Sequence, residues 1–216
     1  MPECARVFPV AGERLGRNVR CPGCGTAVTA RPVEIETRLR EQQQRVSGLG
    51  TSPVPRLPFA VLVDDLRSLW NVGSIFRTAD ACGVGRLVLC GITAYPPRAE
   101  IAKTALGAEA AVPWRYRAEA AEALDELQAE GFVPVALEST DRAVAIDAFA
   151  WPRRPALVIG NEVTGISTHV LAACESHLKI PMRGVKDSLN VAVAFGIAAH
   201  AAASTLTARA GAMRRA

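Results

Sequence analysis

Aromatic side chains are scarce in this sequence. They make up 5% of the 216 residues, whereas half of all residues are apolar. The core must therefore be built mainly from aliphatic side chains, and the apolar content excludes a chain that is disordered throughout. A chain of this length holds one domain of ordinary size plus a small appendage, so two complete large domains are excluded.

The sequence also lacks a secretory signal pattern. The opening MPECARVFPVAGER has polar residues throughout and no sufficiently long apolar run, so we expect a cytoplasmic protein. The most apolar segment, LNVAVAFGIAAHAAASTL, has the length of a membrane span, but it is mostly alanine and carries Asn190, His200 and Ser204. We interpret it as a buried, closely packed helix and expect no membrane partner.

Acidic residues are too few to balance the arginines in the N-terminal part. Residues 1–58 contain 9 Arg and 5 acidic residues, whereas residues 59–216 contain 16 basic and 16 acidic residues. Arginine-rich surfaces bind polyanions by displacing counterions from phosphates. The excess favours a polyanion partner, although a solvated arm with an arginine bias explains it equally well.

Histidine is absent from the first 168 residues, which limits the metal ligands near the N-terminus. Cys4 and the knuckle CPGCG, with Cys21 and Cys24, show the local pattern of a zinc ribbon, but a tetrahedral site needs four ligands. The symmetrical partner of Cys4 falls on Met1 or Val7. The three cysteines are therefore candidate zinc ligands, and the alternatives are a ribbon-like fold without metal or one that borrows a fourth ligand. We expect no disulfide framework in a reducing compartment.

Two composition changes divide the chain. Residues 33–46 have the pattern of a short polar helix and close an N-terminal segment, 1–46, that is zinc-ribbon-like and helical. The sequence SGLGTSPVPRLP, residues 47–58, has the Gly, Ser and Pro content of a linker. The main domain then covers residues 59–216.

Short apolar runs alternate with helical segments from residue 59 onward. Runs that are apolar on both faces are typical of a parallel sheet covered on both sides, and the alternation indicates α/β architecture. The predicted strands are FAVLVDD, RLVLCGI, FVPVALE, ALVIG and HLKIP. The predicted helices are SIFRTADACG, EIAKTALGA, EAAEALDELQAEG and the long segment from Leu189.

The loops after strands matter most, because ligands of open α/β sheets collect there. One such loop, in ALVIGNEVTGIS, resembles a phosphate-binding P-loop, but Ile166 stands where a P-loop has its lysine. Glu162 in the same loop would repel a phosphate. This loop suits a neutral or cationic ligand better, which disfavours nucleoside triphosphate hydrolysis.

Two further loops carry polar residues suited to catalysis. In NVGSIFRTADACGV, a helix that begins near Ser74 would place Arg77 one turn in, within reach of a phosphate or carboxylate; the alternative is a surface ion pair. In IPMRGVKDSLNVAVAFGI, Ser188 and Asn190 open an alanine-rich helix, where Ser188 or Asp187 could simply cap it.

In their order along the chain, the three loops resemble the three motifs of the SpoU, or TrmH-type, branch of the SPOUT methyltransferases. NVGSIFRTADACGV resembles the first motif, LVIGNEVTGIS the second and IPMRGVKDSLNVAVAFGI the third. The resemblance covers residues 59 to about 205. It implies a domain with a deep C-terminal trefoil knot, a homodimer, and S-adenosylmethionine as the methyl donor for a ribose 2′-hydroxyl of tRNA or rRNA. The alternative is a knotted protein that binds RNA without methylating it. Relatives differ in their N-terminal parts, and here the basic excess suggests that residues 1–46 bind RNA.

The resemblance also assigns residues to the site. It implies cofactor contacts at Gly160, Ile180 and Leu189, with Leu137 and Glu138 as further candidates. The catalytic and substrate-handling positions that it implies are Asn71, Arg77, Glu162, Ser188 and Asn190.

The family's mechanism makes the motif arginine the base, which is demanding because a guanidinium is effectively always protonated. We expect Arg77 to bind the adjacent phosphate of the RNA, and either to lose its proton transiently or to act only electrostatically. Glu162 would lie beside the cationic sulfonium or organise its loop and the dimer partner. The remaining polar residues would orient the ribose and the arginine.

Overall fold

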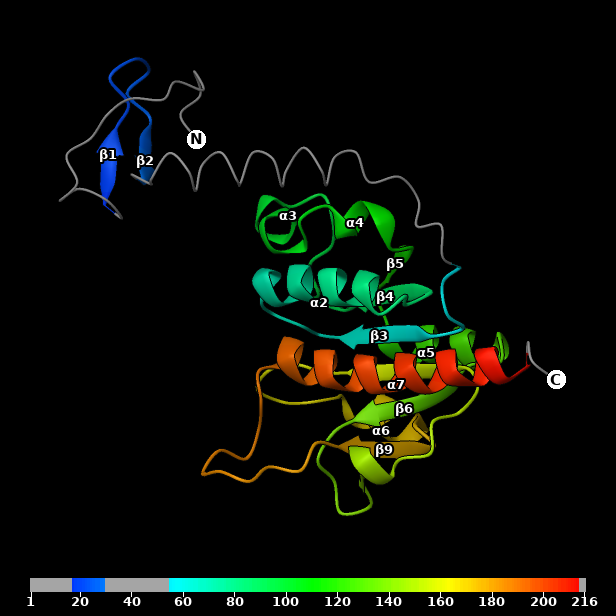
Figure 1. The fold of residues 1–216 in the computed structure, drawn as a ribbon. Helices are drawn as coiled ribbons and strands as arrows, with labels where there is room; N and C mark the ends of the chain where they lie inside the picture. Colours follow the sequence, from blue (N-terminus) through cyan, green and yellow to red (C-terminus); the bar gives the residue numbers. More distant parts are fainter. Residues whose placement is uncertain (1–16, 30–54, 214–216) are drawn as a thin grey trace. The chain divides into compact units, whose positions relative to one another are not determined.

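The computed structural model describes residues 17–29 and 55–213 (Figure 1). Contacts divide the chain into two compact units, Met1–Leu49 and Gly50–Ala216. Cys4 and the helix predicted over residues 33–46 lie outside the described residues.

The described part of the first unit is an antiparallel hairpin. Strands β1 (Asn18–Arg20) and β2 (Ala27–Thr29) pair with Val19 opposite Val28. The turn between them is the cysteine knuckle, in which the Gly23 N–H donates to Cys21 Sγ at 3.4 Å. The zinc ribbon as a whole stays a prediction.

The second unit is built on a seven-stranded sheet in which every neighbouring pair is parallel. The strand order is β5-β4-β3-β8-β6-β9-β7. The strands are β3 (Ala60–Asp64), β4 (Arg86–Cys90), β5 (Trp114–Arg117), β6 (Val133–Leu137), β7 (Val144–Ala145), β8 (Pro155–Ile159) and β9 (Ser176–Lys179). The five predicted strands are confirmed as β3, β4, β6, β8 and β9. Strands β5 and β7 were not predicted. In β5, an edge strand, aromatic residues alternate with arginines, so it has no continuous apolar run, and β7 has only two residues.

Helices cover both faces of this sheet (Figure 1). One face carries α2 (Leu69–Ala81), α3 (Ala99–Ala105), α4 (Ala108–Ala111) and α7 (Val191–Met213). The other carries α5 (Ala120–Ala129) and α6 (Thr168–Ala173), and a short 3-10 helix spans Ile146–Ala148. This arrangement confirms the predicted α/β class. The trefoil knot stays a prediction.

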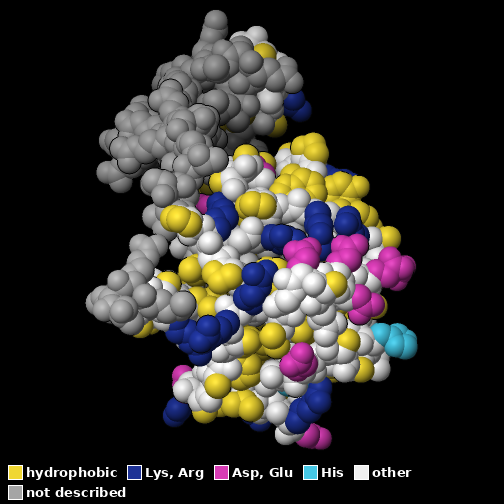
Figure 2. Space-filling view, turned by 90° about the vertical axis from the view of Figure 1, so that its right-hand side faces the viewer, with side chains coloured by type: hydrophobic (Ala, Val, Ile, Leu, Met, Phe, Trp, Pro, Cys, Tyr) yellow, Lys and Arg dark blue, Asp and Glu magenta, His cyan; other side chains and the backbone are white. Residues whose placement is uncertain are grey.

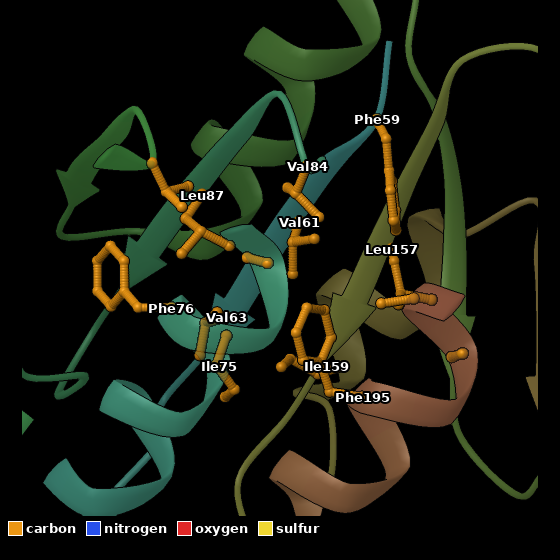
Figure 3. Packing of buried hydrophobic residues seen from close by; sticks show 14 of the residues in the cluster. Phe59, Val61, Val63, Ile75, Phe76, Val84, Leu87, Leu157, Ile159 and Phe195 are labelled. Carbon is orange, nitrogen blue, oxygen red and sulfur yellow. The ribbon is translucent and has the colours of Figure 1, made fainter. Parts of the chain in front are cut away.

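Alternate side chains of the central strands build the two halves of the core. Figure 3 shows Val61 and Val63 of β3 beside Leu157 of β8, facing Ile75 of α2 and Phe195 of α7. The intervening residues of the same strands, Leu62 among them, pack against α5 instead. Both faces are therefore buried, which explains why the strands read as continuous apolar runs.

Helix α2 begins five residues earlier than the sequence pattern indicated. Ser68 caps it, because its hydroxyl accepts a hydrogen bond from the Asn71 N–H at 3.3 Å. The expected start near Ser74 is wrong, since the cap was overlooked. Arg77 consequently lies about 12 Å along the axis from Leu69, at 1.5 Å per residue, and not one turn in.

Helix α7 is buried on one side only. Phe195, Ala198 and Ala202 face the core, whereas Val193 and Ile197 are 51% and 40% exposed. Within residues 17–29 and 55–213, α7 is the one helix long and apolar enough to cross a membrane. Its packing against α2, β6 and β8 makes it a core helix, so the predicted burial holds for its inner side.

Candidate functional site

The residues expected to form the site follow the carboxyl ends of neighbouring parallel strands. These carboxyl-terminal ends lie together at one end of the sheet. The arrows of β3 and β6 point toward this end in Figure 1, and α2 and α7 begin there. The three motif loops therefore come together although they are far apart in the sequence.

Glu162 connects the loop after β8 to the start of α2. Its carboxylate accepts hydrogen bonds at 3.0 Å from the backbone N–H groups of Arg67 and Ser68. A third hydrogen bond, also 3.0 Å, comes from Asn71 Nδ2. The side chain therefore binds the orphan amides near a helix N-terminus, where a carboxylate is favoured.

Asn190 extends this network to the third motif. Its Nδ2 donates to Asn71 Oδ1 at 3.1 Å, while its Oδ1 accepts from the N–H groups of Ala192 and Val193 and caps α7. Asn71, Glu162 and Asn190 thus form one hydrogen-bonded cluster. Their polar atoms bind one another, so the cluster fixes the relative positions of three loops. Asn190 is itself the cap that the sequence placed at Ser188 or Asp187.

The environment of Glu162 keeps its carboxylate ionised. Burial tends to raise the pKa of Glu162, but hydrogen bonds from Arg67, from its own backbone and from Asn71 and Ser68 lower it below the ordinary value of 4.5. A carboxylate with a lowered pKa and two occupied oxygens is a poor proton acceptor. Of its two predicted roles, organising the loop fits this geometry better.

Replacing Glu162 by glutamine should destabilise the protein at neutral pH. We expect Glu162→Gln to lower the free energy of unfolding by about 0.5–1.5 kcal/mol, because an amide cannot accept from all three donors and the exposed position lets water replace part of what is lost. Since the folded pKa is lowered, the contribution is full above pH 4.5 and is lost as pH falls through the folded pKa. Urea unfolding at pH 7 and below pH 4 should show a difference that shrinks in acid; a constant difference contradicts this role.

Arg77 and Ser188 do not join the cluster. Arg77 is exposed and lies six residues beyond Asn71, which on an α-helix is about 9 Å along the axis and about 120° around it. Ser188 is exposed, and its hydroxyl donates to Asp187 Oδ1 at 3.2 Å. The single chain therefore brings together three of the five predicted catalytic positions.

Four of the five predicted cofactor residues lie at three adjacent strand ends. Gly160 follows β8, Leu137 ends β6 with Glu138 directly after it, and Ile180 follows β9, in the sheet order β8-β6-β9. The Glu138 N–H donates to the carbonyl of Leu178 on β9 at 3.0 Å. Leu189 is 38% exposed and directly precedes the Asn190 cap.

The loop after β8 is tightly folded around two glycines. A Cβ on Gly160 would lie 2.3 Å from both Gly165 C and Ile166 N. Gly165 has φ +71, and a Cβ there would lie 2.5 Å from Glu138 Oε2, an oxygen that accepts from the Ile166 N–H at 3.2 Å. Glu138 thus supports this loop, a structural role in addition to the predicted contact with the cofactor.

Two supporting residues were missed from the sequence. Asn161 Oδ1 accepts from the N–H groups of Val163 and Thr164, and its Nδ2 donates to the Asp65 carbonyl at 2.7 Å. The buried Asp64 accepts from the Ser167 N–H at 2.9 Å. The sequence signal for Asn161 is its position two residues after β8, because Asn in such a place indicates a turn. The signal for Asp64, an Asp at the end of an apolar strand, is weak.

The described residues provide two of the three predicted zinc ligands and no complete site. Cys21 and Cys24 lie in the hairpin turn, and no cluster of three or more His, Cys, Asp or Glu side chains suited to a metal occurs in residues 17–29 and 55–213. Cys4 lies outside them. Zinc stays a prediction, which metal analysis of the purified full-length protein checks.

The opposite end of the sheet, formed by the amino-terminal ends of the strands, carries charges of both signs. Figure 2 views the molecule from the side of the strand amino ends and shows basic and acidic side chains intermingled. Arg86 pairs with Glu130 at 2.6 Å, and Arg115 pairs with Glu126 at 3.0 Å. These guanidinium groups have carboxylate partners, so this network offers no surplus positive charge to a polyanion.

Comparison with known proteins identifies the family. The model of the SpoU rRNA methylase family matches residues 58–200. The chain belongs to this family. A TrmH-family relative of Staphylococcus haemolyticus, named as a tRNA/rRNA methyltransferase, is 32% identical over 190 residues, which are 87% of this chain and 73% of the relative. The protein is thus an RNA methyltransferase of the TrmH/SpoU type.

Solved SpoU structures share the fold. The SpoU methyltransferase AviRb of Streptomyces viridochromogenes, in complex with the cofactor AdoMet, has a TM-score of 0.65 and 26% identity, over 84% of this chain and 68% of that one. An RNA 2′-O ribose methyltransferase has a TM-score of 0.61 and 25% identity, over 74% of this chain and 60% of that one. The arrangement of sheet and helices described above is therefore that of SpoU enzymes.

Proposed function

We propose that this SpoU protein transfers the methyl group of S-adenosylmethionine to a ribose 2′-hydroxyl of tRNA or rRNA. The observation that carries the proposal is the cluster of Asn71, Glu162 and Asn190, which joins the three motif loops beside the strand ends expected to hold the cofactor. The AdoMet complex of AviRb and the ribose methyltransferase of the same fold support the choice of donor and acceptor.

The donor fits the residues present. The strand ends at Gly160, Leu137 and Ile180 offer backbone groups and apolar side chains at one end of the sheet. S-adenosylmethionine supplies the electrophilic methyl group on a sulfonium. The ionised Glu162 favours a cationic ligand over a phosphate at this edge.

The chain has to position the 2′-hydroxyl and accept its proton. The 2′-oxygen would form a bond to the methyl carbon as the carbon–sulfur bond breaks, and the hydroxyl proton would pass to solvent water, either directly or through Arg77 acting transiently as the base. Glu162 accepts hydrogen bonds from the start of α2, and Asn71 and Asn190 bind each other. These residues therefore hold the loops in place, so that the 2′-oxygen can approach the methyl carbon in line with the carbon–sulfur bond. Ser188 and Arg77, which are exposed, are left to contact the RNA.

We further propose that the working unit is a homodimer in which Arg77 of one protomer completes the site of its partner. Arg77 is exposed on α2 and lies about 120° around the helix from Asn71. Trp70, Val193 and Ile197 expose apolar surface on the neighbouring helices α2 and α7. Exposed apolar side chains that gather on adjacent elements mark association surfaces. A second copy is the occupant that accounts for both observations.

Placing a charge on this apolar face should separate the protomers. We expect Ile197→Asp to be monomeric by analytical ultracentrifugation and to keep its fold, since Ile197 is 40% exposed. Methyl transfer should fall by at least about 10²-fold, because each site then lacks its arginine. Ser204→Asp, on the same outer side of α7 farther from the site, is the control. A monomeric variant with full activity contradicts the shared site.

The chemistry can be tested with purified components. The full-length protein is incubated with methyl-labelled S-adenosylmethionine and total RNA, and the RNA is digested to nucleosides. We expect the label in a 2′-O-methylnucleoside, and none when the acceptor is the corresponding DNA. Label in a base refutes the ribose specificity, and RNA binding without any transfer favours the alternative of a non-catalytic RNA-binding protein.

A further inference from the structure

An aromatic side chain is exposed beside the site although aromatics are scarce in this chain. Tyr95, in the segment 91–98 between β4 and α3, is 44% exposed. Its ring centroid lies 4.7 Å from that of Tyr116 and 6.0 Å from that of Trp114, both on β5. Ile92 in the same segment is 65% exposed. Exposed groups of large apolar side chains mark interaction surfaces.

A shallow cavity of about 310 Å³ is lined mainly by the residues that directly follow Tyr95 in the chain. Its walls are mostly proline and alanine, with one guanidinium and one carboxylate; the lining residues are Pro96, Pro97, Arg98, Ala99, Ala102 and Glu109. Glu109 Oε2 accepts from the Gly107 N–H at 3.0 Å, which orients the carboxylate. We call this cavity, together with Ile92 and Tyr95, the Tyr95 surface.

The charges around the Tyr95 surface are balanced. Arg98 and Lys103 are offset by Glu100 and Glu109, so the surface lacks the surplus of cations that a phosphate backbone requires. The features of this surface suit an unpaired nucleobase: the Tyr95 ring can stack on a base, the cavity walls are apolar, and Arg98 and Glu109 offer a hydrogen-bond donor and an acceptor. Such a base presents a flat face for stacking and a polar edge for hydrogen bonds.

The Tyr95 surface is hydrogen-bonded to the loop that positions the site. The Ile92 N–H donates to Asp65 Oδ1 at 2.9 Å, and the Leu66 N–H donates to Thr93 Oγ1 at 2.8 Å. The next two amides, those of Arg67 and Ser68, hold Glu162. RNA bound at Tyr95 would therefore be held at a fixed position relative to the Asn71 cluster.

We propose that the Tyr95 surface binds an unpaired base of the substrate RNA outside the methylated nucleotide, with the base stacked on Tyr95 and its edge toward Glu109 and Arg98. The inference rests on the proposed function, since the RNA bound is the methyl acceptor. It names a substrate class: RNA in which a nucleotide near the target is single-stranded.

Steady-state kinetics on total tRNA test this role. Tyr95→Ala should raise the KM for RNA about tenfold and leave kcat within about twofold, because it removes one stacking partner. Tyr95→Phe, which keeps the ring, should resemble wild type. Val144→Ala is the matched control, because Val144 is similarly exposed, at 43%, but lies on β7 at the other edge of the sheet. An unchanged KM in Tyr95→Ala overturns the inference.

Photo-cross-linking gives a reading that does not depend on how well a variant folds. Wild-type protein is irradiated with an oligoribonucleotide containing 4-thiouridine, and the cross-linked peptide is identified by mass spectrometry. Cross-links to residues 92–98 support the inference, and cross-links confined to other segments contradict it. Dissociation of the dimer by Tyr95→Ala would also contradict it, because the surface would then be an interface between protomers.

These outcomes separate the two proposals. If wild-type protein methylates RNA while Tyr95→Ala keeps its KM, the proposed function stands and the Tyr95 surface fails. If wild-type protein transfers no methyl group but cross-links to RNA at residues 92–98, the proposed function fails and an RNA-binding surface remains.

Discussion

Arg77→Ala should abolish most methyl transfer while leaving S-adenosylmethionine binding intact. The expected loss in kcat is about 10²- to 10³-fold, the size seen when one charge-stabilising group is removed from a transition state. Arg77 is exposed on α2 and is proposed to contact the RNA and not the cofactor, so the calorimetric affinity for S-adenosylmethionine should not change. Transfer at the wild-type rate would contradict the essential role.

Arg77→Lys distinguishes how the arginine acts. A lysine keeps the positive charge but not the planar fork, so partial activity indicates electrostatic binding of a phosphate, and a loss as large as in Arg77→Ala indicates that the guanidinium itself is required.

Mixed dimers test whether Arg77 acts in the partner's site. An Arg77→Ala protomer is co-expressed with an Ile180→Asp protomer that is shown not to bind the cofactor. If the arginine crosses the interface, each mixed dimer has one intact site and activity returns. Mixed dimers with no activity would place Arg77 in the site of its own chain.

Gly160→Ala should have the largest effect on the structure of the site. The added Cβ would lie 2.3 Å from backbone atoms of Gly165 and Ile166, which cannot move aside as a flexible side chain can. We expect a loss of about 3 kcal/mol or more in the free energy of unfolding, from overpacking of the loop. Thermal unfolding should show a Tm lower by about 6–12 °C, and binding of S-adenosylmethionine should be lost.

Gly184→Ala is the matched control for this variant. Gly184 lies in the loop before α7, and a Cβ there meets no atom within 4 Å. Stability and cofactor affinity should therefore stay at wild-type values. Equal Tm losses in the two variants would contradict the account of Gly160.

The sheet was predictable because its central strands are buried on both faces. Residues such as Leu62, Leu87 and Leu157 belong to runs that no helical spacing explains, and all of those runs became strands. Edge strand β5 was not predictable in this way. Its sequence WRYR alternates a half-buried aromatic with arginines that pair with Glu126 and Glu130 of another segment.

The meeting of three of the predicted site residues could be foreseen from the sequence, whereas the place of Arg77 could not. Asn71, Glu162 and Asn190 each follow a strand or open a helix, so their meeting at one edge follows from the parallel order of the sheet. The place of Arg77 on α2 depends on where the helix begins. The helix was expected to begin near Ser74, but the Ser68 hydroxyl caps it, so that it begins five residues earlier, at Leu69. A misplaced cap changes which side chains share a face, because each residue turns the helix by about 100°.

The hydrogen bonds that fix the loops could not be read from the sequence. Glu162 binds backbone amides 95 and 94 positions away, and Asp64 binds the amide of Ser167. Backbone donors are the same at every residue, so no pattern of side chains indicates which amide a carboxylate will find.

The central claim is that this protein methylates a ribose 2′-hydroxyl of cellular RNA. Mass spectrometry of RNA nucleosides from cells that lack the gene tests it most directly. We predict that one 2′-O-methylnucleoside in tRNA or rRNA is lost and returns with the wild-type gene but not with Arg77→Ala. An unchanged set of 2′-O-methylnucleosides in the cells without the gene would contradict the claim.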